Sequence, residues 1–237
     1  MPYREFPQHD PHIACLWTRD PEPQPQRHRI LPDACVDIVW AGRRLVVAGP
    51  ATRAVIAGIP AHTAVFGVRF RVGAAGAALG IPAAEVLDST VPLDDIWGAE
   101  MTERVGDDPR VQTLAAVVRA QLNQEPDALV RAAATGADPN LGARQLRRRF
   151  ADAVGYGPKT LQRILRFQRF LALAQTGSDL ARVALEAGYA DQAHLTRECS
   201  RLSGLPPAAL LAAGAGPAGD RSASFKTAGP VAATLAA

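Results

Sequence analysis

The chain has 237 residues, of which 48% are hydrophobic and 21% charged, and its formal net charge at pH 7 is +3. This hydrophobic content is enough to build one large core or two of ordinary size, which excludes a largely disordered chain. The N-terminus MPYREFPQHD is charged and contains prolines, and no run of 18 apolar residues occurs, so we expect neither a secretion signal nor a membrane span and predict a cytoplasmic protein.

Basic residues are concentrated in the C-terminal part of the chain. Eleven Arg or Lys residues and five acidic residues lie between 141 and 213, so this segment carries a net charge of +6 and the rest carries −3. A basic segment beside a mildly acidic one indicates that the C-terminal part meets a polyanion. A solvated basic surface without a partner is the alternative that charge alone leaves open.

Three cysteines, Cys15, Cys35 and Cys199, lie far apart in the sequence. They form neither a disulfide framework nor a CxxC pair, which indicates a reducing compartment. We expect each to be a small buried hydrophobic residue.

Short runs rich in Val, Ile and Phe, separated by Gly or Pro, fill the N-terminal part up to residue 72 and predict strands. The runs lie at 34–40, 43–49, 53–59 and 63–72. In the last run, every second residue is apolar, with Phe66 and Phe70 on one face and Arg69 on the other, which predicts a half-buried antiparallel strand. Short helices are expected near 82–88 and 93–105.

From Arg110 onward, apolar residues recur with the period of helices. The expected helices lie at about 110–122, 127–134, 142–154, from 158 to near 177, from 179 to 187, and from 191 onward. The tail after residue 213 contains small residues, Gly and Pro with little to bury, so we predict that 214–237 is disordered.

Three arginines project together from the helix expected at 142–154. Its apolar face holds Phe150, and the opposite face holds Arg144, Arg147 and Arg148. Arg149 lies nearer the apolar boundary and is expected to extend its charged end to solvent or to pair, rather than to read a base.

The stretch EAGYADQAHLTRECSRLSG, residues 186–204, predicts a tight turn and a second helix with a polar outer face. Ser178 or Asp179 is suited to cap the helix before a turn at Gly188, and Asp191 is suited to cap the helix after it. The outward residues are Gln192, Thr196 and Arg197. A short helix, a glycine turn and a second helix with an exposed polar face is the helix-turn-helix arrangement, whose second helix enters the major groove.

Together, RQLRRRFADAVGYGPKTLQRILRFQRFL and DLARVALEAGYADQAHLTRECSRLSGLPPAALL resemble the two-module DNA-binding domain of AraC/XylS-family transcription regulators. The resemblance implies a bacterial, sequence-specific transcription factor that binds double-stranded DNA with two recognition helices. The DNA-binding residues it implies are Arg144, Gln145, Arg147 and Arg148 in the first helix, and Gln192, His194, Thr196 and Arg197 in the second. Arg suits guanine and Gln suits adenine, although any one of these side chains could instead contact phosphate.

The first module departs from the family pattern. Its scaffold helix, within PDALVRAAATGADPN, is short and interrupted by Gly136 and Pro139, and Gly142 stands where a Ser cap is usual. Whether this abbreviated module reads bases is left open.

The N-terminal half resembles a β-rich domain of some actinobacterial members through LPDACVDIVW, AGPAT and GVRFRVGAAGAALGIPAAEV. The implied fold class is α+β, with a β-rich regulatory domain and an all-α domain of two helix-turn-helix modules joined by a linker helix. The expected limits are 1–108 for the regulatory domain, 109–126 for a connector helix, 127–213 for the DNA-binding domain and 214–237 for the tail.

Two roles remain open for the N-terminal domain. It could bind a small-molecule effector, for which the candidate residues are Trp17, Asp37, Trp40, Arg69 and Arg71. It could instead be a protein-interaction or dimerisation module, giving a homodimer. RNA polymerase is a further partner to consider.

We predict that the chain is not an enzyme and needs no cofactor or metal. HDPHIAC has ligand-like spacing but lacks a second tight pair. DNA-repair alkyl acceptors, which fuse an AraC-like domain to a zinc-bound cysteine, need four cysteines near the N-terminus, where this chain has only Cys15 and Cys35.

Overall fold

The computed structural model describes residues 3–134, 136–137, 140–175 and 179–214. All but the first residue of the tail predicted to be disordered therefore lies outside the described residues. The chain divides into two compact units. The first unit comprises residues up to 26, 35–50 and 58–158, and the second comprises 27–34, 51–57 and the residues from 159 on.

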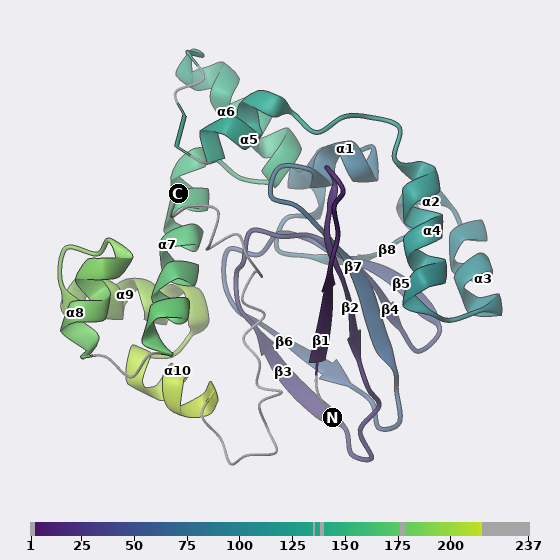
Figure 1. Ribbon diagram of the computed structural model, residues 1–237, viewed down its shortest axis with the longest axis horizontal. Helices are drawn as coiled ribbons and strands as arrows, with labels where there is room; N and C mark the ends of the chain where they lie inside the picture. The colour runs from purple at the N-terminus through teal and green to yellow at the C-terminus, as the bar shows by residue number, and fades with distance from the viewer. Residues whose placement is uncertain (1–2, 135, 138–139, 176–178, 215–237) are drawn as a thin grey trace. The chain divides into compact units, whose positions relative to one another are not determined.

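A six-stranded antiparallel sheet forms the centre of the first unit (Figure 1). Its strand order is β1-β2-β7-β4-β5-β8. The strands are β1 (Tyr3–Pro7), β2 (Ile13–Arg19), β4 (Asp37–Ala41), β5 (Arg44–Ala48), β7 (Val65–Phe70) and β8 (Thr90–Pro92). The strands expected at 34–40, 43–49 and 63–72 are present, whereas β1, β2 and β8 were not predicted.

Strand β7 is central, and all six of its residues are buried. The predicted alternation is confirmed, because Phe66 and Phe70 enter the main core while Arg69 faces the opposite side. The prediction of a half-buried strand is wrong. Both faces of β7 are covered, so even the Arg69 side chain is only 1% exposed.

Helices cover the face of the sheet that carries the main core. They are α1 (Ala75–Leu79), the 3-10 helix η1 (Ala83–Val86), α2 (Asp94–Trp97), α3 (Glu100–Asp107) and α4 (Val111–Gln121). Helix α4 buries Leu114 and Val118 in this core. The single helix expected over 93–105 is wrong, because Gly98, at φ +83°, separates α2 from α3.

The first predicted helix-turn-helix module, α5 (Ala128–Ala134) and α6 (Ala143–Val154), also belongs to the first unit. Helix α6 lies against α1 and η1 and buries Phe150 and Val154 (Figure 1). The approach is close enough that a Cβ on Gly76 of α1 would lie 2.2 Å from the Asp152 carbonyl oxygen of α6.

The second unit contains the linker helix and the second module. Its helices are α7 (Pro158–Ala174), α8 (Leu180–Ala187), α9 (Gln192–Ser203) and α10 (Pro207–Gly214). It also takes in most of a two-stranded sheet of β3 (Gln26–Ile30) and β6 (Val55–Ile59), which we call the ribbon. Helices α7, α8 and α9 match the predicted segments, whereas α10 was not predicted as a separate helix; strand β6 was expected, but β3 was not.

Candidate nucleic-acid interface

Side-chain caps begin both α8 and α9, and a glycine makes the turn between them. The Asp179 carboxylate accepts from the Arg182 N–H at 3.3 Å, and the Asp191 carboxylate accepts from the His194 N–H at 2.6 Å. Gly188 has φ +94°, a left-handed conformation that glycine adopts without steric cost. The Asp191 cap and the glycine turn are confirmed; of the two residues predicted to cap α8, Asp179 does so, and Ser178 lies outside the described residues.

Helix α9 has an apolar inner face and a polar outer face. Leu195, Cys199 and Leu202 are buried, as predicted. Burial raises the pKa of the Cys199 thiol to about 11, so this residue serves as a small hydrophobic side chain rather than a reactive one. Gln192 and Arg197 are exposed on the outer face.

Two contacts hold α9 in place within the second unit. Arg163 of α7 donates to both carboxylate oxygens of Glu198, at 2.7 and 3.1 Å. Partial burial raises the pKa of Glu198, but the hydrogen bonds and charge of Arg163 outweigh this, and the net pKa lies below its usual range. Further along, the Arg166 guanidinium lies 5.6 Å from the ring centre of Tyr189, which meets the His194 ring edge-on at 5.2 Å.

These contacts identify positioning residues that sequence reasoning did not single out. Arg163 and Arg166 were noted only as part of the basic surplus, and Tyr189 only as part of the turn. The spacing of Arg163 and Arg166 on α7 offered a signal, because residues three apart lie on one face of a helix and can both reach the same neighbouring helix.

The four residues expected to read DNA from α9 differ in how free they are. The Thr196 hydroxyl donates to the Gln192 carbonyl at 2.8 Å, and the ring Nδ1 of the half-buried His194 lies 3.4 Å from the Ala190 N–H. Among the described residues, Arg197 has neither a hydrogen-bond nor an ion-pair partner. Gln192 and Arg197 are therefore the side chains most available to an outside ligand.

Helix α6 presents a denser basic surface. Its N-cap, Gly142, makes no side-chain capping bond, as expected from its lack of a side chain. The four candidate residues Arg144, Gln145, Arg147 and Arg148 are all exposed. Of the two roles expected for Arg149, the structure shows pairing, since its guanidinium lies 3.0 Å from the Asp127 carboxylate that caps α5.

Three of the five candidate effector residues come together on the face of the sheet opposite the main core. The Trp17 indole N–H donates to Asp37 at 2.9 Å, and Arg69 Nε donates to the same oxygen at 3.2 Å. Arg69 also pairs with Glu5 of β1 at 3.1 Å. Gly67 makes room for the indole, because a Cβ there would lie 2.6 Å from the Trp17 ring.

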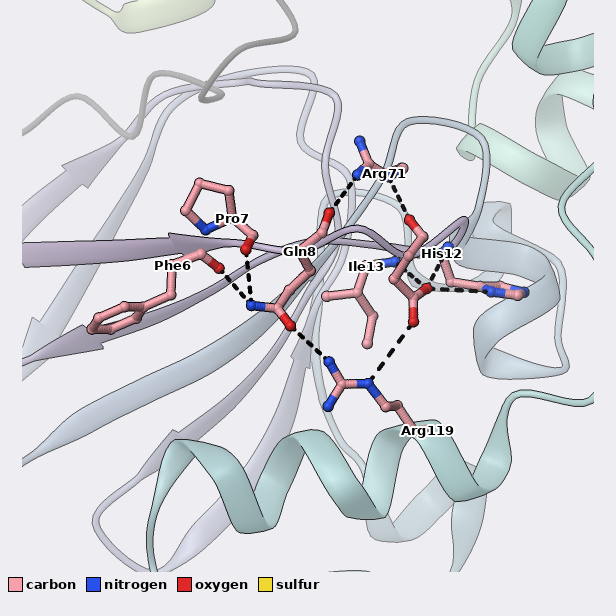
Figure 2. Close-up of polar contacts among 8 residues, drawn as sticks. Phe6, Pro7, Gln8, His12, Ile13, Arg71 and Arg119 are labelled. Carbon is pink, nitrogen blue, oxygen red and sulfur yellow. Dashed lines mark hydrogen bonds and ion pairs between the residues drawn. The ribbon is translucent and has the colours of Figure 1, made fainter.

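The other two candidates, Trp40 and Arg71, lie elsewhere. Trp40 is in the main core, stacked on Phe66 at a centroid distance of 6.1 Å. Arg71 donates to the backbone carbonyls of Gln8 and Asp10, both at 2.7 Å, and so holds the turn between β1 and β2 (Figure 2). Arg119 of α4 reaches the same turn, donating to the Gln8 side chain at 2.8 Å (Figure 2).

All three cysteines are buried and none forms a disulfide, which confirms the expectation that each is a small buried side chain. In the part of the chain that the structure describes, no three His, Cys, Asp or Glu side chains gather to hold a metal ion. His12 of the HDPHIAC segment instead places its ring Nε2 2.7 Å from the Gln124 carbonyl. No helix among the described residues is long and apolar enough to span a membrane.

Two family models match the chain, one in each half. Residues 137–213 match "Helix-turn-helix domain", and residues 7–92 match "Domain of unknown function (DUF6597)". The helix-turn-helix match confirms the resemblance for the C-terminal segment, which contains α6 to α10.

The chain is also similar to two solved structures of ToxT from Vibrio cholerae. For an apo variant from strain SCE256 the identity is 11%, the TM-score is 0.37, and the match covers 89% of this chain and 95% of that one. For the protein from strain O395 the corresponding values are 10%, 0.34, 88% and 95%. These similarities are too low to carry an inference about this chain. No curated protein matches it significantly.

Proposed function

We propose, on the premise that residues 137–213 are an AraC-type helix-turn-helix domain, that the chain is a transcription regulator that reads a specific duplex DNA sequence. Helix α9 enters the major groove with Gln192 and Arg197 toward the bases. Helix α6 contacts the same duplex through Arg144, Arg147 and Arg148. The function requires no catalytic step.

The outer face of α9 is the observation that carries this proposal. A helix held from behind by Arg163 and Arg166 leaves Gln192 and Arg197 exposed at its N-terminal half. Amide and guanidinium groups are the side chains that bond adenine and guanine in two places at once. The net positive charge of the segment supplies the phosphate attraction that accompanies such reading.

The first test selects bound duplexes from a random-sequence DNA pool with the full-length protein at a fixed salt concentration, because basic contacts make affinity salt-dependent. We expect a motif with two elements about one helical turn, roughly 34 Å, apart. A motif covering one groove only would mean that α6 contacts the phosphate backbone of the DNA and reads no bases. No enrichment of any sequence would contradict the proposed function.

The second test compares two arginines of the same module. Arg197→Ala is expected to weaken binding to the selected duplex by roughly 10- to 100-fold, the cost of one good bidentate base contact, and binding to random duplex much less. The control is Arg182→Ala on α8, where the arginine is exposed and pairs with Glu186. Equal losses on both duplexes would make Arg197 a phosphate contact.

We also propose that the β-rich domain modulates DNA binding. Two observations support this: the buried cluster of Trp17, Asp37 and Arg69 places charged groups inside the sheet domain, and α6 packs directly on α1 and η1. Isothermal titration of small polar metabolites, followed by the DNA assay with any that bind, tests it. A binder that leaves DNA affinity unchanged would contradict the proposal.

A protein-interaction role for the same domain is the second candidate. Strand β1 is at the end of the sheet order, and its Phe6 side chain is 46% exposed. An apolar residue on an edge strand suits pairing with another strand, as in a homodimer. Sedimentation of the wild type and of Phe6→Ser tests this, and an unchanged monomer in both would reject it.

A further inference from the structure

Two groups from the N-terminal half of the sequence close the C-terminal end of α9. Arg29 Nη1, in strand β3 of the ribbon, donates to the Ser203 carbonyl at 2.7 Å. The backbone N–H of Ala54, directly before strand β6, donates to the Leu202 carbonyl, also at 2.7 Å. All of these residues belong to the second unit.

These bonds supply what the end of the helix lacks. The last four carbonyls of any α-helix have no partner within the helix, and its C-terminus carries partial negative charge. The ribbon satisfies two of these carbonyls in α9 and places a guanidinium beside them. Gly204, at φ +75°, turns the chain there in a left-handed conformation that glycine adopts without steric cost, close beside Arg29.

The ribbon is joined to α7 as well. The buried Gln168 of α7 donates from its amide nitrogen to the Pro32 carbonyl, at 2.5 Å, in the segment that follows β3. Helix α7 in turn holds the middle of α9 through Arg163 and Glu198. Helix α9 is therefore held at Glu198 by the linker helix and at its C-terminal end by the ribbon, in addition to the ring contact between His194 and Tyr189.

We propose that Arg29 is a positioning residue for sequence reading, and that the ribbon sets the angle at which α9 presents Gln192 and Arg197. This rests on the proposed function. Helix α9 has 12 residues and is therefore about 18 Å long, so a pivot near Glu198 moves its reading end when its other end is released. Base contacts tolerate errors of only about 0.5 Å, whereas long flexible side chains follow a phosphate more easily.

The test uses full-length Arg29→Ala and the duplex that the wild type selects. Loss of a charge-assisted hydrogen bond at the helix end is expected to weaken binding to that duplex about tenfold, and binding to random duplex about twofold or less. Base-interference mapping should show lost base contacts in the half of the DNA motif that α9 reads and unchanged contacts in the other half of the motif. Arg29→Lys, which keeps a cationic donor, should recover most of the discrimination.

Arg27→Ala is the matched control, because Arg27 is an exposed arginine on the same strand. It removes the same charge without touching α9. The positioning role is refuted if Arg29→Ala and Arg27→Ala weaken binding to the selected duplex equally. It is also refuted if Arg29→Ala weakens binding to the selected and the random duplex by the same factor.

Two other results of this test have a defined meaning: an unfolded Arg29→Ala variant, and a wild type that selects no DNA sequence. If thermal melting shows that Arg29→Ala is unfolded, Ala54→Pro replaces it, since this change removes the N–H that bonds Leu202 and leaves the charge in place. Retained discrimination in that variant refutes the ribbon's role. If the wild type selects no sequence, the proposed function fails first and this inference with it.

Discussion

Replacing Gly76 by alanine tests whether α6 is held against the sheet domain. An added Cβ would lie 2.2 Å from the Asp152 carbonyl oxygen and 3.4 Å from the Ala153 Cα. Both neighbours are backbone atoms, so no side chain can rotate away. Ordinary contact begins at 3.4 Å, so α1 and α6 must separate by about 1.2 Å.

The magnitude follows from two opposing effects. Overpacking a close contact costs about 1–3 kcal/mol. Alanine in place of glycine inside a helix contributes up to about 1 kcal/mol in the other direction. The expected result is a net loss of about 1–2 kcal/mol, which lowers the melting temperature of a domain of this size by roughly 2–8 °C.

Thermal melting and amide hydrogen exchange measure the effect. We expect faster exchange in α6, because it is the helix that the new methyl group displaces. Gly58→Ala is the control, since a Cβ there meets nothing within 4 Å and the backbone is not left-handed. A Gly76→Ala protein as stable as the wild type, with unchanged exchange in α6, would refute the close packing of α1 and α6.

Three further predictions concern the second module. Glu198→Gln should lower the free energy of unfolding by about 1–2 kcal/mol at neutral pH. Because the pKa of Glu198 is depressed in the folded state, this difference between variant and wild type is present above the usual glutamate pKa and should vanish as acid protonates the wild-type carboxylate. Denaturation curves of both proteins at decreasing pH measure it. Asp191→Ala removes the α9 cap and should cost about 1 kcal/mol by urea denaturation, and an unchanged midpoint would mean that the cap at the His194 N–H is dispensable. The Cys199 thiol, whose pKa burial raises to about 11, should resist thiol reagents at about pH 8 and react only on unfolding; labelling of the native protein would contradict its burial.

The second module could be predicted from sequence because its signals are local. A cap at Asp191, a glycine at 188 and an apolar stripe through Leu195 all act within about one turn of the helix. The same holds for the exposed arginines of α6 and for the pairing of Arg149 with Asp127. In each case, helix periodicity alone decides which side chains point outward.

Strands β2 and β3 lacked a local sequence signal. In β2 the register shifts between Ile13 and Cys15, which interrupts the alternation that marks a strand. Strand β3, QRHRI, is mostly polar, so hydrophobic pattern does not reveal it.

Contacts between distant residues were also beyond reach. The five effector candidates were chosen by residue type. Sheet register puts Trp40 opposite Phe66, on the other face from Asp37 and Arg69. Arg71 lies beyond the end of β7 and bonds the turn between β1 and β2. The bond from Arg29 to α9 joins residues 174 positions apart, and no periodicity marks it. The start of the DNA-binding domain at residue 127 remains a prediction.

The composition of the second unit bears on how the protein is synthesised. Its bonds join Pro32 to Gln168 and Arg29 to Ser203, so residues made early must wait for partners made much later. Contacts between such distant positions close slowly, because the chain between them must first be ordered. On the ribosome, the ribbon emerges long before α9, so Arg29 and the Ala54 N–H lack these partners until residue 203 has been made. We therefore expect nascent chains truncated before residue 203 to depend on chaperones more than the complete chain does.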